Sequence, residues 1–451
     1  MRKSSFWFET ALLQQGWSHG VRATVEAGRF TSLAPGAHQP DDAVHAIAIP
    51  GLCNVHSHAF QRSLAGLAEM AGPDGDDFWS WREVMYRFLD RMGPDEMEAI
   101  AAQAYAEMLE GGYVRVGEFH YLHNDADGRA YANPAEMAAR IVAAATETGI
   151  GLTLLPVFYA HADFGGTPPN HGQRRFITNP DSFARLFEAS VAMLRGGGNI
   201  GIAPHSLRAV TAAELATILP LCPDGPVHIH AAEQVKEVDA SLAFYGARPV
   251  EWLLANTDVD ARWCLVHATH LTNAECDRLA ASGAVAGLCP VTEANLGDGI
   301  FPAVRYLHAG GCFGTGTDSN ILIDPASELR ALEYSQRLRH MGRNLLASDD
   351  SASVGARLFR AAQAGGAQAL GQAPSMMVGA SADFLTLDAA HPALMARSGD
   401  LLLDSWIFAA GAAAIDGVWC RGRQLVSGGR HVHRDAIRAR YRRAVEGLLS
   451  A

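Results

Sequence analysis

The alternation of short apolar segments with amphipathic ones through the middle of the chain constrains the fold most. Eight segments have the apolar, β-branched character of strands, at 46–55, 113–119, 151–158, 199–204, 226–230, 263–266, 284–289 and 312–317. Helical patterns fill most of the gaps between them, at 95–110, 134–148, 180–194, 212–219, 273–281 and 327–340. Because eight strands alternating with helices favour a closed parallel sheet, we expect an α/β protein with a (β/α)8 TIM-like barrel.

The two ends of the chain have a different pattern. Strand-like segments lie between glycine-rich or polar turns at 6–13, 20–26 and 30–33, and again at 382–388 and 417–422. We therefore predict one small β-sandwich domain built from both termini, with residues 1–49 as its N-terminal part and residues 376–451 as its C-terminal part. Residues 50–375 are the predicted catalytic barrel.

Charge and composition limit the possible partners and locations. The chain has 451 residues and a formal net charge of −12, with no basic stripe, so nucleic acid and anionic membranes are poor partners. No apolar run approaches the roughly 18 residues of a membrane span. Glu9 interrupts the N-terminal segment too early for a signal peptide. The seven cysteines form no CxxC pair, which is typical of reduced thiols and favours a cytoplasmic location.

Histidines and one aspartate follow the ends of the predicted barrel strands. His56 and His58 come at the end of the first strand, His230 ends the fifth, and Asp318 follows the eighth. In a parallel barrel these strand ends meet at one rim, where catalytic groups lie. Three imidazoles and one carboxylate suit Zn²⁺ with an open position for water. The sequence therefore predicts a metal site made of His56, His58, His230 and Asp318.

Several neighbours compete for roles on the same rim. His228 has the same side-chain phase as His230 but lies deeper in the barrel, so we expect a buried structural role for it. Glu233 can carry a proton to a leaving group, although an acid in a first helical turn is the ordinary alternative. His267 can hydrogen-bond the attacking water, and His270, further along the loop, is the other candidate.

With these residues in place, the chain resembles the mononuclear deaminase branch of the amidohydrolase superfamily along its whole length. The markers are His56-Ser57-His58, His230-Ala231-Ala232-Glu233, His267, Asp318-Ser319 and the flanking stretches 49–52 and 380–388. The resemblance implies hydrolysis of a non-peptide C–N bond by a Zn²⁺-activated water. It also implies that Asp318 and His267 take or orient the water proton, in shares left open here, while Glu233 protonates the nitrogen. No lysine is placed for a bridging carbamate, which favours a single metal ion.

Three further stretches, 54–66, 118–123 and 288–302, are similar to those of N-formimino-L-glutamate deiminases of histidine degradation. This similarity implies a dicarboxylate substrate, whose formimino group is hydrolysed to give N-formyl-L-glutamate and ammonia. It implies one Zn²⁺ per chain, with Fe²⁺ or Mn²⁺ as possible substitutes, and family members are often homodimers. The substrate-binding residues that it implies are Gln61, Arg82, Tyr121, His205 and Arg208.

The two arginines can each offer a planar fork to a carboxylate. Arg208 lies at a rim position, three residues beyond His205. Arg82 lies in an aromatic-rich insertion, residues 78–83, that could cover the barrel mouth. An exposed helix with a surface ion pair is the alternative environment for Arg82. Which arginine binds which carboxylate stays open at this point.

Two other functions also stay open. A purine or pterin deaminase, such as one resembling guanine deaminase, would use the same metal and proton carriers. Purine deaminases of the superfamily tend to have Ser-Asn where this chain has Thr292-Glu293. A non-enzymatic relative would keep the barrel for assembly, which the intact ligands and proton carriers argue against. Metal content and ammonia release distinguish this relative from the enzymes.

Overall fold

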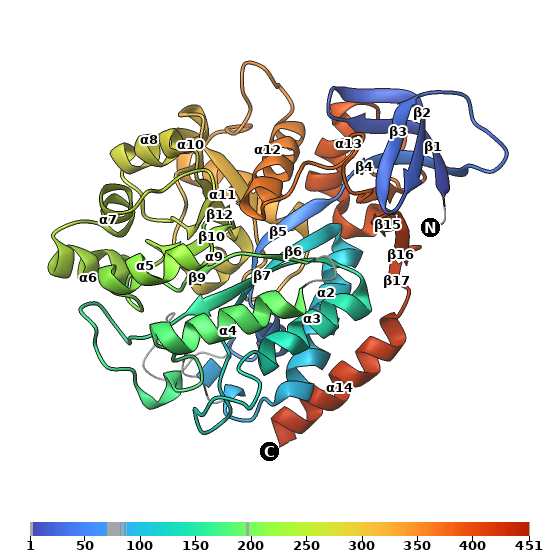
Figure 1. Cartoon of the computed structure of the whole chain (residues 1–451). Helices are drawn as coiled ribbons and strands as arrows, with labels where there is room; N and C mark the ends of the chain where they lie inside the picture. The colour runs from blue at the N-terminus through green and yellow to red at the C-terminus, as the bar shows by residue number, and fades with distance from the viewer. Residues whose placement is uncertain (1–2, 70–81, 83–84, 87, 195–197, 451) are drawn as a thin grey trace.

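A barrel of parallel strands, with eight strand positions, forms the middle of the molecule (Figure 1). The computed structural model describes residues 3–69, 82, 85–86, 88–194 and 198–450. The barrel strands are β5 (Leu52–Ser57), β6 (Tyr113–His120), β7 (Gly151–Phe158), β8 (Asn199–Ile200) with β9 (Ala203–Pro204), β10 (Val227–Ala231), β11 (Trp263–His267), β12 (Val285–Leu288) and β13 (Cys312–Thr315). The predicted (β/α)8 barrel is confirmed.

Two runs of hydrogen-bonded strands close into the barrel at two seams. β5 to β8 form one run and β10 to β13 form the other. One seam is a bridge between Ile202 and Val227, and the other joins Ser57 to Asp318. At the second seam the backbone N–H of His58 donates to the carbonyl of Asp318 at 2.9 Å. The first and last barrel strands therefore meet where the sequence places predicted metal ligands.

The predicted strand at 46–55 is in fact two strands in different sheets. β4 (Ala43–Pro50) pairs with β1 (Ser4–Leu13) and β14 (Phe384–Leu387) at the chain ends, and β5 pairs with β6 in the barrel. Gly51 makes the crossing possible, because a Cβ there would lie 2.3 Å from a methyl group of Val114. The predicted strand at 199–204 is also divided into β8 and β9, which both pair with β7, while Ile202 between them donates its N–H to the carbonyl of Pro226 on the other side.

Helices surround the barrel and connect its strands. All six predicted helices are confirmed, within three residues at each end. The helices are α2 (Pro94–Gly111), α3 (Glu136–Thr148), α4 (Pro180–Met193), α5 (Ala212–Ile218), α6 (Val235–Tyr245), α7 (Pro249–Asn256), α8 (Asn273–Ser282), α9 (Pro290–Leu296), α10 (Ala303–His308), α11 (Pro325–His340), α12 (Val354–Ala369), α13 (Asp400–Ser405) and α14 (Arg434–Ser450). Short 3-10 turns are η1 (Ala59–Leu64), η2 (His171–Gln173), η3 (Leu219–Leu221) and η5 (Gly411–Ala414), and η4 (Trp406–Ala410) is a π-helical turn. Among the described residues, no helix is long and apolar enough to cross a membrane.

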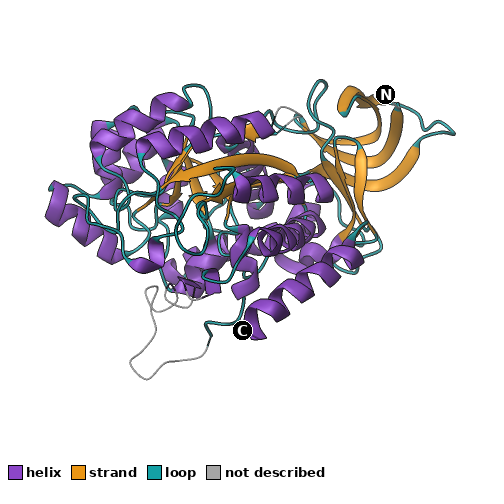
Figure 2. Ribbon diagram, turned by 60° about the horizontal axis from the view of Figure 1, so that its bottom comes forward, coloured by secondary structure: helices purple, strands orange, loops and turns teal. Residues whose placement is uncertain are grey.

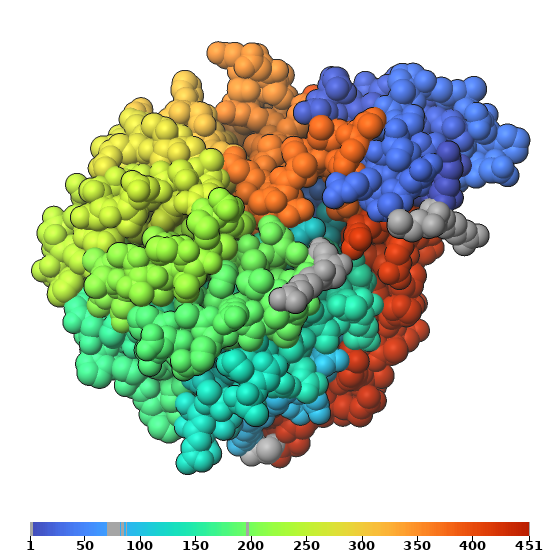
Figure 3. All heavy atoms as spheres, viewed as in Figure 1, coloured from blue at the N-terminus to red at the C-terminus, as the bar shows by residue number. Residues whose placement is uncertain are grey.

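The two chain ends form one β domain at the side of the barrel, as predicted. Figure 2 shows strands beside the barrel, and in Figure 3 the blue N-terminal atoms lie against orange and red C-terminal atoms. The strands of this domain run in the order β17-β16-β15-β14-β4-β1-β2-β3 in a single hydrogen-bonded sheet. They are β1 (Ser4–Leu13), β2 (Gly16–Glu26), β3 (Arg29–Pro35), β4, β14 (Phe384–Leu387), β15 (Ile415–Cys420), β16 (Arg423–Ser427) and β17 (Arg430–His431). Aromatic packing joins the two ends, since the rings of Phe384 and Trp419 stack at 4.8 Å and Phe6 packs edge-on against Phe384. The limits of the predicted domains stay a prediction.

Gly316→Ala should destabilise the protein and weaken metal retention. A Cβ at Gly316 would lie 2.8 Å from both the Cβ and the carbonyl oxygen of His56. The backbone of His56 cannot move aside as the end of a flexible side chain can. Overpacking of this kind costs about 1–3 kcal/mol. We expect a lower Tm and less metal per chain. Gly447→Ala is the matched control, because a Cβ there meets nothing within 4 Å on helix α14. Unchanged Tm and metal content in Gly316→Ala would contradict this account.

Candidate active site

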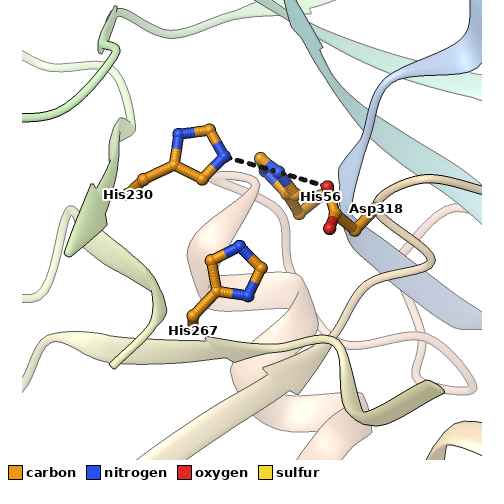
Figure 4. Close-up of side chains that lie close together, drawn as sticks. All are labelled: His56, His230, His267 and Asp318. Atoms are coloured by element: carbon orange, nitrogen blue, oxygen red, sulfur yellow. Dashed lines mark hydrogen bonds and ion pairs between the residues drawn. The ribbon is translucent and has the colours of Figure 1, made fainter. Parts of the chain in front are cut away.

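Buried side chains converge at the carboxyl ends of the barrel strands. Figure 4 draws His56, His230, His267 and Asp318, and His58 lies beside His56. His56 Nε2 lies 3.2 Å from His58 Nε2 and 3.1 Å from His230 Nε2. The Asp318 Oδ1 atom lies 3.2 Å from Nε2 of both His56 and His58. In a tetrahedral zinc site with bonds of about 2.0 Å, neighbouring ligand atoms are about 3.3 Å apart. The spacing of these four atoms therefore suits one divalent cation.

The hydrogen bonds behind the imidazoles set their tautomers. His58 Nδ1 donates to the carbonyl of Phe119 at 2.9 Å, and His230 Nδ1 donates to the carbonyl of His205 at 3.0 Å. A carbonyl can only accept, so each Nδ1 carries the hydrogen and each Nε2 presents a lone pair. Burial lowers the pKa of both imidazoles, which keeps them neutral. Lone pairs that face one another at this distance are stabilised by a cation between them.

His267 also lies beside this cluster, on strand β11. His56, His230, His267 and Asp318 each have one possible ligand atom within 4.8 Å of those of the other three. His58 lies 3.2 Å from both His56 and Asp318, which is closer than that limit. The predicted ligand set with His58 therefore stays a prediction, and His267 is the neighbouring candidate.

The turns that hold His267 and Asp318 are strained. Both residues have left-handed backbone conformations, with φ of 66° and 44°. Such conformations cost about 1–3 kcal/mol in non-glycine residues and cluster at functional sites. The Asp318 turn is secured by Asn320, whose amide donates to Ser57 Oγ at 3.1 Å and to the carbonyl of His58 at 3.0 Å. The turn after β13 is thus tied to the end of β5.

Glu233 and Glu293 flank the ring of His267. Glu233 Oε1 lies 3.7 Å from Nε2, and Glu293 Oε1 lies 3.4 Å from Nδ1. Burial raises the pKa of Glu233 to about 7, helped by the charge of Asp318. Burial lowers the pKa of His267. The negative charges of Glu233 and Glu293 have the larger effect and raise the pKa of His267 to about 10. A carboxyl group that holds its proton near neutral pH can act as a general acid.

A cavity of about 560 Å³, open to solvent, lies above the cluster. Apart from His56, which lies behind the others, every predicted site residue lines it: His58, Gln61, Arg82, Tyr121, His205, Arg208, His230, Glu233, His267 and Asp318. In its wall, the Gln61 amide donates to the Tyr121 hydroxyl at 2.9 Å. The guanidinium of Arg82 lies over the ring of Tyr86 at 5.5 Å. The rest of the predicted aromatic insertion, residues 78–81 and 83, lies outside the described residues.

Arg208 is buried in this wall without a carboxylate partner among the described residues. It is 7% exposed, and its Nε has no hydrogen-bond partner there. A buried guanidinium N–H without a hydrogen-bond acceptor is costly. The cavity side of Arg208 is therefore suited to an anionic group of a ligand.

The competing histidines have other partners. His228 Nε2 donates to the carbonyl of Ala369 at 2.8 Å, deep in the barrel, as expected for a structural residue. The Nε2 of His270 donates to the carbonyl of Asp298 at 2.9 Å, and His270 does not line the cavity. His267 is the histidine at the site.

Comparison with known proteins identifies the family. The family model described as "Amidohydrolase family" matches residues 47–425. The chain belongs to the amidohydrolase family. It is 51% identical over 433 residues to a protein of Pseudomonas aeruginosa named formimidoylglutamate deiminase, covering 95% of this chain and 96% of that one. A 5-methylthioadenosine/S-adenosylhomocysteine deaminase of Natronomonas pharaonis is 28% identical, covering 82% and 80%. A crystal structure of an amidohydrolase from Brucella melitensis has a TM-score of 0.96 and 52% identity, covering 99% and 100%.

Some residues of this amidohydrolase site were not predicted. Glu293 orients His267 and also accepts from the backbone N–H of Cys289 at 2.9 Å. Tyr159 and Phe176 line the cavity. Tyr159 follows strand β7 directly, so the strand-end rule that singled out the histidines also points to it. Phe176 lies in a long loop, and no local pattern marks it.

We expect about one tightly bound divalent metal per chain of this amidohydrolase. The four closely spaced ligand atoms form a single cluster, and the two lysines of the sequence are Lys3 and Lys236. Neither lysine follows the third or fourth barrel strand, where a bridging carbamate would have to lie. Elemental analysis of the purified protein should give a ratio near one. Two metals in every active preparation would overturn this expectation.

Proposed function

We propose that this amidohydrolase hydrolyses N-formimino-L-glutamate to N-formyl-L-glutamate and ammonia. The observation that carries the proposal is Arg208, a buried arginine that pairs with no carboxylate of the described residues, on the wall of a cavity whose floor is a candidate metal-binding cluster. A substrate with carboxylates satisfies that arginine. The 51% identity to a formimidoylglutamate deiminase, over nearly the full length of both chains, supports the same substrate.

We propose Zn²⁺ as the metal, held by His56, His58, His230 and Asp318. Three neutral imidazoles and one carboxylate are ligands that zinc favours, and His56 Nε2 lies 3.1–3.2 Å from the other three donor atoms. When bound, such a cation supplies an activated water and Lewis-acid polarisation of the substrate.

The protein's own groups move the protons. Water adds to the formimino carbon, and the C=N bond becomes a C–N single bond in a tetrahedral intermediate. Asp318 accepts the proton of the attacking water, and His267, whose raised pKa keeps its ring protonated, orients that water. Glu233, with its raised pKa, gives its proton to the imino nitrogen as water adds. The proton taken from the water then passes to the same nitrogen, the hydroxyl proton of the intermediate returns to Glu233, and ammonia leaves as the formyl C=O bond forms.

The cavity wall binds the rest of the substrate. In the part of the chain that the structure describes, the guanidinium groups of Arg208 and Arg82 line it, and they are the proposed partners of the two carboxylates. Gln61, Tyr121 and His205 complete the polar lining. We also propose that the protein is a homodimer in the cytoplasm. The seven free cysteines support the cytoplasmic location.

A panel of substrates tests the function. Ammonia release should be measured with N-formimino-L-glutamate, guanine, cytosine and N-guanidino-L-glutamate, using metal-loaded protein. We expect turnover of the formimino compound to exceed that of the others by orders of magnitude. Preferred turnover of guanine would replace this proposal with the purine deaminase alternative, and no ammonia from any compound would support a non-enzymatic relative.

A further inference from the structure

Tyr159 lies on the cavity wall in a fixed position. It follows strand β7 and is 4% exposed, and its ring packs edge-on against His205 with centroids 4.5 Å apart. The backbone N–H of Thr178 donates to the carbonyl of Tyr159 at 2.9 Å. Tyr159 and Arg208 line the same cavity.

Gln173 determines which way the Tyr159 hydroxyl donates. Gln173 is fully buried, and its Oε1 accepts from the backbone N–H of Asn170 at 2.9 Å. A backbone N–H can only donate, so the amide oxygen faces Asn170 and the amide nitrogen faces Tyr159. That nitrogen donates to the Tyr159 hydroxyl oxygen at 2.7 Å. The hydroxyl is therefore an acceptor toward Gln173, and its own hydrogen must point elsewhere.

The remaining direction for this hydrogen is the cavity. Among the described residues, no oxygen or nitrogen accepts a hydrogen bond from the Tyr159 hydroxyl. Arg208 lines the same cavity, so one anionic group of a ligand can contact both side chains.

We infer that Tyr159 donates a hydrogen bond to the same substrate carboxylate that Arg208 binds. This inference rests on the proposed function and deepens it, because it assigns a second, neutral donor to one carboxylate. A carboxylate in this position accepts from both groups, whereas a neutral purine offers no anionic oxygen there. Tyr159, oriented by Gln173, is then a residue that selects a dicarboxylate substrate.

Tyr159→Phe removes the hydroxyl and keeps the ring that packs against His205. A hydrogen bond to a charged group affects affinity by about 10- to 100-fold. We expect kcat/KM for N-formimino-L-glutamate to fall by about that factor, mainly through KM, with metal content and Tm measured alongside. A change below threefold would overturn the inference.

Truncated substrates show whether Tyr159 and Arg208 share a carboxylate. N-formimino-4-aminobutyrate lacks the α-carboxylate, and N-formimino-L-norvaline has a methyl group in place of the γ-carboxylate. The losses caused by Tyr159→Phe and by Arg208→Met should both disappear with the same one of these compounds. Losses that disappear with different compounds would contradict a shared carboxylate.

Gln173→Glu tests the direction of the hydroxyl. Glutamate keeps an oxygen for the Asn170 N–H but replaces the amide nitrogen by an oxygen, which would take the Tyr159 hydrogen away from the cavity. We expect a rise in KM similar to that of Tyr159→Phe. Added to Tyr159→Phe, the same change should have less than a threefold further effect. If Gln173→Glu raises KM as much in the Tyr159→Phe protein as in the wild type, its effect comes from the new negative charge. That result would contradict the role given to Gln173.

The two levels of proposal fail in different ways. If the wild-type protein releases no ammonia from N-formimino-L-glutamate, the proposed function is wrong, and the inference about Tyr159 is overturned with it. If the wild type turns this substrate over and Tyr159→Phe does so equally well, only the inference about Tyr159 is wrong.

Discussion

Replacing Glu233 by glutamine should leave the metal in place and lower kcat by about 10²–10⁴-fold, the usual contribution of a general acid or base. Glutamine has nearly the same shape, and the backbone N–H of residue 233 would still donate to Glu237 at 3.2 Å. It cannot carry the proton that the leaving nitrogen needs. Steady-state ammonia release and elemental analysis of the same preparations would measure the effect.

Glu233→Asp is the matched variant, since it keeps an acid but shortens the side chain by one methylene. It should retain more activity than the glutamine variant if proton transfer is the function of this residue. A glutamine variant with near-normal kcat and normal metal content would make Glu233 a structural residue, and the proposed mechanism would then be wrong.

Arg208→Met should reduce kcat/KM for N-formimino-L-glutamate by an amount corresponding to about 2–5 kcal/mol of binding free energy. Methionine keeps much of the apolar stem but removes the planar fork, and part of the loss is the cost of leaving a buried carboxylate unpaired. Long-range attraction cannot replace the arginine, because the chain has a net charge of −12. Kinetics with metal content checked in both proteins would give the value.

Arg248→Met is the control for loss of an arginine as such. Arg248 pairs with Glu275 at 2.8 Å and does not line the cavity, so its replacement should affect stability more than kcat/KM. A change of less than threefold in Arg208→Met would mean that Arg208 does not touch the substrate. The purine-type alternative would then gain support.

The barrel and the location of the site could be predicted because both are encoded locally. Each barrel strand is an apolar run, and a polar residue such as His230 or Asp318 where the run ends must lie on the common rim. The pairing of Glu293 with His267 could not be predicted, because it depends on the path of two loops after different strands. The division of the first predicted strand at Gly51 was also missed, since the apolar pattern continues through both sheets.

Several helices were the other gap in the prediction, among them the long helices α6, α12 and α14, with 11, 16 and 17 residues. Helices α7, α9 and α10 have eight, seven and six residues, too few for a clear 3.6-residue period. The orientation of Tyr159 by Gln173 depends on one amide placed by a 3-10 turn, η2, which has no sequence periodicity at all. Such contacts carry specificity, and they become visible only in three dimensions.

The seam between β5 and β13 has a consequence for how the protein matures. His56 and His58 come from the first barrel strand and Asp318 follows the last, so the full set of donors exists only after the ribosome has made almost the whole barrel. A cation bound across that seam stabilises the closed barrel and not the open chain, and its affinity adds to the stability of the folded state. Metal acquisition should therefore be a late event in biogenesis, and metal starvation should lower the amount of folded protein in the cell as well as its activity.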